Sequence, residues 1–155
     1  MTGLDTGRVT GRVAAPVRAW APGRRLAVIA AALAGLLTVN LVIYAIGRAL
    51  GGTFRYTQNG GSVPVEPVAI TFLSLGPLVS ALVVTAALAR TWPVFLRIAR
   101  IAGPVFAVVT IGVMTLPADF DMTSTVCLAA MHLVTIPAML VAFDALARRR
   151  PRTAG

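Results

Sequence analysis

Four long apolar runs divide this chain, and shorter polar or charged stretches separate them. An α-helix rises about 1.5 Å per residue, so roughly twenty apolar residues cross the hydrocarbon core of a bilayer, which is about 30 Å thick. Each of the four runs is close to this length or longer. We therefore expect an all-α membrane protein, a bundle of four transmembrane helices with spans at about 26–48, 68–89, 93–117 and 122–146.

The third span has the least regular beginning. Arg97 and Arg100 interrupt it, and the apolar stretch that follows them, 101–116, is short for a span. Arginine side chains at a helix end can extend to the membrane interface, so both residues can be helical. We expect this helix to begin near Pro93, because proline suits a first turn. In the second span, Gly76-Pro77 predicts a kink, since proline has no N–H to donate.

The first loop, 49–67, contains a clear turn signal. This is Asn59-Gly60-Gly61, where asparagine and glycine adopt positive φ at low cost. The short runs before and after it, 54–57 and 62–65, predict the two strands of a β-hairpin, with Pro64 confining its strand to a sheet edge. An irregular loop is the alternative.

The distribution of arginine predicts which side of the membrane each loop faces. The formal net charge is +9, and all 14 basic residues are arginine. Twelve of them lie before the first span, around the start of the third or after the fourth, and only Arg48 and Arg55 lie on the other side. Positive residues next to spans stay in the cytoplasm. We expect both termini inside a bacterial inner (cell) membrane, the hairpin outside, and flexible basic cytoplasmic tails at 1–25 and 148–155.

The same arginines argue against nucleic-acid binding, because they flank apolar spans and do not form one basic face on a soluble fold. Asp144, near the end of the fourth span, is expected to pair with Arg148 four residues on. Six arginines are expected to anchor the cytoplasmic helix ends at the interface: Arg24, Arg25, Arg97, Arg100, Arg148 and Arg149.

A stripe of polar residues follows one face of the fourth span. Each helical residue advances by about 100°, so Asp121, Thr125, His132 and Thr135 lie near one line. Asn40 is the other strongly polar residue near mid-depth, in the first span. Together these five side chains are the candidate intramembrane site.

His132 is the only histidine, and apolar residues surround it in the sequence. Ionisable residues within membranes are candidates for function, so the ring could accept a proton or bind a metal or a haem iron. The alternative is a neutral, structural ring that faces the bundle interior and bonds to a threonine, to Asn40 or to a backbone carbonyl, a bond worth about 0.6–2 kcal/mol. We favour the structural role.

The common catalytic motifs are missing from the sequence. It has no Gly-rich phosphate loop with a lysine, no nucleophile elbow and no His/Cys cluster with the spacing of zinc ligands. We expect no catalytic residues, no metal, no cofactor and no enzymatic activity. The expected partners are the lipid bilayer and either a second copy of the chain or another membrane protein.

Two stretches carry a resemblance to a known family. These are VEPVAITFLSLGPLVSALVV in the second span and TLPADFDMTSTVCLAAMHLVTIPAML through the last turn and the fourth span. Over roughly residues 25–150, the chain resembles an actinobacterial family of small four-pass membrane proteins that is known as a domain of unknown function. The pair Met131-His132 is typical of that family, so the resemblance implies that His132 is not there by chance. It implies no activity.

Three classes of function remain. We favour a non-enzymatic component of the membrane, such as an assembly or envelope partner. A small multidrug-type transporter is the first alternative, but such transporters use a carboxylate in the first helix, and 26–46 contains none. A redox subunit that binds haem or a quinone through His132 is the second.

Overall fold

The computed structural model describes residues 21–148, which form four long helices and one small hairpin. The predicted fold class is confirmed, because all four helices are long and apolar enough to cross a membrane and a two-stranded sheet lies between the first and second. The helices are α1 (Pro22–Ala49), α2 (Pro67–Leu88), α3 (Val94–Thr110), which continues into the π-helical turn η1 (Ile111–Thr115), and α4 (Met122–Ala147).

The helix ends differ from the expected spans by a few residues. Helix α1 begins at Pro22, four residues before the expected start, because proline at a first helical position forfeits no hydrogen bond. Helix α2 begins with Pro67 for the same reason. Beyond α3, the helical path ends at Thr115, two residues before Pro117. The expected tails, 1–25 and 148–155, lie for the most part outside the described residues.

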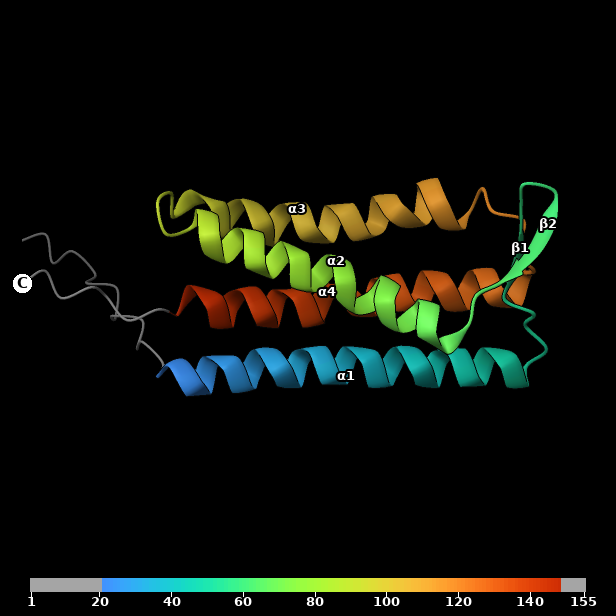
Figure 1. Cartoon of the computed structure of the whole chain (residues 1–155), viewed down its shortest axis with the longest axis horizontal. Helices are drawn as coiled ribbons and strands as arrows, with labels where there is room; N and C mark the ends of the chain where they lie inside the picture. Colours follow the sequence, from blue (N-terminus) through green and yellow to red (C-terminus); the bar gives the residue numbers. More distant parts are fainter. Residues whose placement is uncertain (1–20, 149–155) are drawn as a thin grey trace, which may run out of the picture.

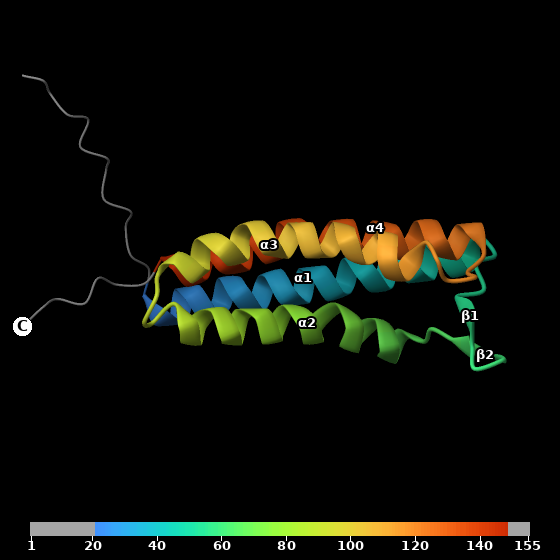
Figure 2. The same cartoon turned by 90° about the horizontal axis from the view of Figure 1, so that it is seen from above.

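Helix α4 is the central helix of the bundle. It packs along α1 on one side and along α3 on the other, and Figure 1 shows it between them. Helix α2 crosses these three obliquely, with its last turns beside α3 and its first turns nearer α1 (Figure 1). The hairpin lies at one end of the bundle, and the start of α1 and the end of α4 lie at the opposite end (Figures 1 and 2). We call the first of these the hairpin end.

One core fills the half of the bundle away from the hairpin. Its buried residues come from α1, α2 and α4: Leu36, Leu78, Leu82, Met139, Ala142 and Phe143. Helix α3 approaches this core closely at Gly103, where an added Cβ would collide with the sulfur of Met139. A glycine at this position therefore sets the distance between α3 and α4.

A second core closes the hairpin end, and Phe54 is at its centre. This side chain is 0 % exposed, and its ring packs on Tyr44 with 4.7 Å between ring centroids. The ring fits between α1 and α4 because Gly47 has no side chain: a Cβ there would lie 2.7 Å from Phe54 Cζ and 2.7 Å from Cys127 Sγ. The loop that follows α1 is thus fixed into the bundle by one aromatic ring.

The predicted hairpin is confirmed. Strands β1 (Arg55–Gln58) and β2 (Gly61–Pro64) pair antiparallel, so each is shifted by one residue from the expected range. The turn residues Asn59 and Gly60 both have positive φ, 51° and 78°, which is the conformation of a two-residue type I′ turn. This turn matches the right-handed twist of the strands and thereby fixes their register.

Candidate functional site

A cavity of about 690 Å³ lies within the bundle at the hairpin end. Its walls come from the first two turns of α2, from η1, from the middle of α4 and from the hairpin, and Asn40 of α1 lies at its wall as well. Small-molecule sites in proteins usually have volumes of about 300–1,000 Å³. The cavity therefore has the size of a ligand site.

The oblique course of α2 creates this cavity. The first turns of α2 diverge from α3 (Figure 1), and the cavity lies between them. Leu73 of α2 and Val113 and Met114 of η1 line the cavity and are still 68, 68 and 66 % exposed. The cavity consequently opens sideways, between α2 and η1, toward the apolar surface of the bundle.

The π-helical turn η1 shapes the wall opposite α2. Its defining hydrogen bond runs from Leu116 N–H to the carbonyl oxygen of Ile111, at 2.9 Å. The wider turn coincides with an inward position of Thr115, which is only 4 % exposed and lines the cavity.

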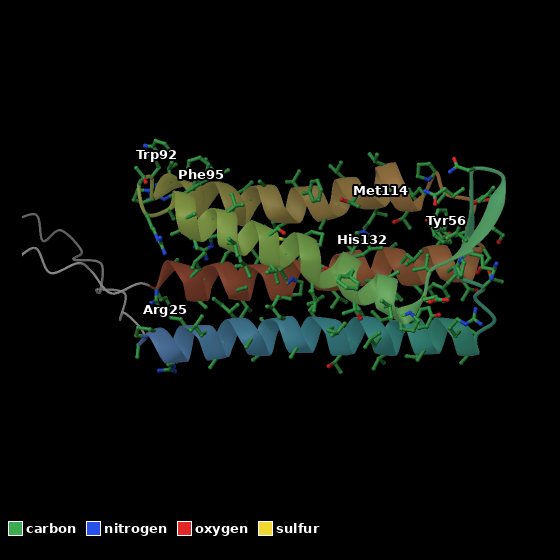
Figure 3. The ribbon with its side chains drawn as sticks, in the orientation of Figure 1. Arg25, Tyr56, Trp92, Phe95, Met114 and His132 are labelled. Atoms are coloured by element: carbon green, nitrogen blue, oxygen red, sulfur yellow. The ribbon has the colours of Figure 1, made fainter. Side chains whose placement is uncertain are left out.

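His132 lines the cavity from α4, and its hydrogen bonding is partly satisfied within its own helix. The ring nitrogen Nδ1 lies 2.8 Å from the carbonyl oxygen of Leu128. A carbonyl can only accept, so Nδ1 carries the hydrogen, and in the neutral ring Nε2 is an acceptor. Among residues 21–148, no partner of Nε2 is found. Figure 3 shows His132 between α4 and α3, with Met114 on the α3 side and Tyr56 toward the hairpin.

Asn40 is the most deeply buried polar side chain of the cavity, at 1 % exposed. Its Nδ2 donates to Ser74 Oγ of α2 at 2.8 Å, which joins α1 to α2. Its Oδ1 is buried and has no hydrogen-bond partner within the described part of the chain. An unsatisfied buried carbonyl costs about 1–3 kcal/mol, so this oxygen would gain from a donor inside the cavity.

The structure divides the predicted polar stripe into two groups. Asn40, His132 and Thr135 line the cavity, although the Thr135 hydroxyl already donates to the carbonyl of Met131. Thr125 also bonds within α4, to the carbonyl of Asp121, and is not part of the cavity wall. A direct bond between His132 and Asn40 or a threonine does not form, because helix backbone and Ser74 provide nearer partners.

Asp121 ties the hairpin to α4. It is the N-cap of the helix: Oδ1 accepts from Ser124 N at 2.9 Å, which satisfies a free amide of the first turn. Its Oδ2 accepts from the backbone N and the hydroxyl of Thr53, at 2.9 and 2.7 Å, and from Ser124 Oγ at 2.6 Å. Ser124 Oγ in turn accepts from Phe54 N at 2.8 Å.

Asp119 repeats this arrangement on β1. Its carboxylate accepts from the backbone N of Thr57 at 2.7 Å and from the Thr57 hydroxyl. We call this hydrogen-bonded group the clasp, and its residues are Thr53, Thr57, Asp119, Asp121 and Ser124. Arg48 supports it by donating to the carbonyls of Gly52 and Thr53, at 3.1 and 2.8 Å. The clasp holds the hairpin over the cavity. The hairpin contributes Tyr56 and Gln58 to the lining of the cavity.

The clasp should weaken only in acid. Hydrogen bonds from Ser124 and then from Thr53 hold the pKa of Asp121 well below its ordinary value of 3.8, and bonds from Thr57 lower the pKa of Asp119. A carboxylate with a lowered folded-state pKa stabilises the fold above its unfolded-state pKa, and this contribution is lost as the pH falls through the folded value. We expect melting temperature in detergent to be independent of these groups between about pH 5 and 7 and to fall below about pH 4.

Replacing both carboxylates by amides provides the control. The variant Asp119→Asn/Asp121→Asn should melt below wild type at about pH 7 and lose less stability than wild type between about pH 5 and 3. An equal acid-induced loss in wild type and the double variant would show that the clasp is not the acid-sensitive element.

The predicted arginine anchors lie at the helix ends away from the hairpin. Arg24 and Arg25 are in the first turn of α1, Arg97 and Arg100 lie in the first half of α3, and Arg148 is the C-cap of α4. Arg149 lies outside the described residues. Asp144, expected to pair with Arg148, forms an ion pair with Arg100 of α3. Both side chains are more than 40 % exposed, so this bond contributes at most about 1 kcal/mol.

Sequence reasoning missed several residues of the site. Ser74 and Thr115 are single hydroxyls among apolar residues, and only helix packing brings them to the cavity. Ser124 was within reach, because Asp121 stands just before a long apolar run, where aspartate is a preferred N-cap that accepts from an amide of the first turn. The role of Phe54 has no local sequence signal, since its partners lie in α1 and α4.

Comparison with known proteins identifies one relationship. A family model described as "Family of unknown function (DUF6069)" matches residues 16–152. No curated protein matches the chain, and no solved structure does.

Proposed function

The chain belongs to this family of unknown function, and from its geometry we propose that it is a non-enzymatic component of a bacterial cell membrane that binds a lipid-soluble small molecule. The observation that carries the proposal is the cavity of about 690 Å³, which is lined mainly by apolar side chains and holds a few inward polar groups. Such a combination is typical of ligand sites: apolar walls provide affinity, and a few polar groups fix orientation.

The proposed orientation places both termini in the cytoplasm and the hairpin outside. An even number of helices puts both ends of the described chain on one side, and that side carries most of the arginine. On this proposal the cavity opens into the outer half of the membrane. The membrane would be the inner membrane of a bacterium, actinobacterial by the family resemblance, and a second copy or another membrane protein remains a proposed partner.

The two alternative functions receive unequal support. None of the described residues lining the cavity is acidic, so a transported cation would find no counter-charge there. The haem alternative has one favourable observation: Nδ1 of His132 bonds to a carbonyl, as in histidines that ligate metal through Nε2. A Soret band in the purified protein would favour the haem alternative over a lipid-soluble ligand without iron.

Native mass spectrometry tests the proposed function. Protein extracted from its membrane in mild detergent should carry an additional noncovalent mass, and Ala69→Phe, which fills the cavity wall on α2, should remove it. Ala87→Phe, an exposed position on the same helix, should keep it.

The alternative is that the cavity is only a packing defect. Filling a defect of that kind raises stability, because the cavity itself carries a free-energy cost. Equal bound mass in wild type and Ala69→Phe, together with a higher melting temperature of the variant, would contradict the proposal.

A further inference from the structure

Two hydrogen-bond acceptors in the cavity have no partner among residues 21–148. One is Oδ1 of Asn40, whose side chain is 99 % buried and whose Nδ2 is already bonded to Ser74. The other is Nε2 of His132, which is an acceptor in the neutral ring because Nδ1 carries the hydrogen that it donates to the carbonyl of Leu128. Both side chains line the same cavity, so a ligand that carries hydrogen-bond donors would satisfy both.

Hydroxyl groups in the same wall complete the arrangement. Ser74 Oγ accepts from Asn40, which leaves its own hydrogen free to donate, and Thr115 is 96 % buried with no hydrogen bond found among the described residues. A hydroxyl is both donor and acceptor, so a ligand hydroxyl could donate to Asn40 or His132 and accept from Ser74 or Thr115. A carbonyl ligand could satisfy only the two hydroxyls.

The rest of the lining limits the charge of the ligand. Around these polar groups the described cavity wall consists largely of apolar side chains from α2, η1 and α4, with no arginine and no carboxylate. A charged head would lose its hydration without gaining an opposite charge, which is strongly unfavourable in a membrane. The ligand must therefore be uncharged.

The open side of the cavity indicates where an apolar tail would lie. The exposed side chains of Leu73 on α2 and of Val113 and Met114 on η1 form the edges of the opening, on the surface that faces lipid. A tail leaving between these edges would stay in the hydrocarbon of the bilayer. A head held deep in the cavity and a tail outside it match an amphiphile that enters from the membrane.

Resting on the proposed function, we propose that the ligand is an uncharged amphiphile whose head carries hydroxyl groups, and that His132 and Asn40 accept their hydrogens. A quinol and a diacylglycerol both have such a head. The oxidised form of a quinol, the quinone, has nearly the same shape and tail but presents carbonyl acceptors where the quinol presents hydroxyl donors. The cavity should therefore bind the reduced form in preference to the oxidised form.

The test uses four probes with protein in phosphatidylcholine nanodiscs: decylubiquinol kept reduced, decylubiquinone, dioleoylglycerol and decylbenzene. Affinities are measured by native mass spectrometry and by the shift in melting temperature. We expect decylubiquinol to bind roughly 10–100-fold more tightly than decylubiquinone, because the quinone leaves both acceptors unsatisfied. If dioleoylglycerol also binds tightly, any head with hydroxyl groups is sufficient for binding. If dioleoylglycerol binds weakly, the cavity prefers the quinol ring as the carrier of the hydroxyl groups.

Two variants assign the preference to His132. His132→Leu removes the Nε2 acceptor and should reduce the quinol-to-quinone affinity ratio at least severalfold, with the melting temperature of the unliganded protein as a check of folding. Thr125→Val is the matched control, since this residue lies on the same helix, its hydroxyl donates to the carbonyl of Asp121 and it is not part of the cavity wall, and it should keep the wild-type ratio.

The outcomes separate this inference from the proposed function. Equal or tighter binding of the quinone, or a ratio unchanged in His132→Leu, would overturn the inference. If decylbenzene then still binds and the cavity-filling variant Ala69→Phe abolishes that binding, the cavity remains a site for lipid-soluble molecules. If none of the four probes binds, the proposed function fails as well.

Discussion

The variant Phe54→Ala is expected to lower the free energy of unfolding by about 3–5 kcal/mol, the usual range for removing a fully buried phenylalanine. The ring is 0 % exposed and packs on Tyr44, so its loss leaves a void between α1 and α4 at the hairpin end. The backbone of Phe54 has a φ of 51°, a conformation that alanine adopts no better than phenylalanine. Thermal and denaturant unfolding in detergent, with the variants side by side, measure the change.

Two companion variants separate packing from backbone strain. Phe54→Gly loses the same ring but tolerates a positive φ, so it should be more stable than Phe54→Ala by about 1 kcal/mol. Phe72→Ala removes a ring that is 72 % exposed on α2 and should change stability little. Equal losses in Phe54→Ala and Phe72→Ala would mean that the ring of Phe54 does not hold the hairpin end together.

Gly47→Leu is expected to lower the free energy of unfolding by a similar amount, because it adds volume at the place where Phe54→Ala removes it. A Cβ at this position would already lie 2.7 Å from Phe54 Cζ and Cys127 Sγ, so a leucine must displace the ring. The loss should therefore approach that of Phe54→Ala, about 3 kcal/mol or more. Gly35→Leu, in the same helix, is the control: no atom of another segment within residues 21–148 lies within 4 Å of an added Cβ there, and removing a mid-helix glycine favours the helix.

The double variant Gly47→Leu/Phe54→Ala checks that the two residues act on one space. The leucine would occupy part of the volume that the ring vacates, so the double loss should be clearly smaller than the sum of the single losses. Additive losses would contradict direct packing of Phe54 against Gly47.

Most of the fold can be predicted from the sequence, because a segment that crosses a bilayer must satisfy all its backbone hydrogen bonds within the protein. Apolar runs of twenty or more residues must be helices, and Asn59-Gly60 specifies a tight turn between short strands, so the four helices and the hairpin were predictable. Helix ends were predicted less well: Pro22 extends α1 into a segment that carries arginine and gives no apolar signal. Only the structure shows that α4 is central and that α2 is oblique.

The candidate site was predictable in part. Helical spacing placed His132 and Thr135 on one face of the fourth span, and in the structure both line the cavity together with Asn40. The same spacing also placed Thr125 and Asp121 in the stripe; in the structure Thr125 is not part of the cavity wall, and Asp121 belongs to the clasp. Arg100 of α3 pairs with Asp144 of α4, and Ser74 of α2 accepts a hydrogen bond from Asn40 of α1. Both contacts join different helices, so the spacing of residues along one helix cannot predict them.

The cavity opens to the outer half of the membrane only if the hairpin lies outside and both termini lie inside. Alkaline phosphatase fusions measure this orientation most directly, because the enzyme is active only outside the cytoplasm. A fusion after Gly60, in the hairpin turn, is expected to be active. Fusions after Thr91, between α2 and α3, and after Gly155 are expected to be inactive. Activity after Thr91 or Gly155, or none after Gly60, would contradict the orientation and with it a cavity that opens to the outer half of the membrane.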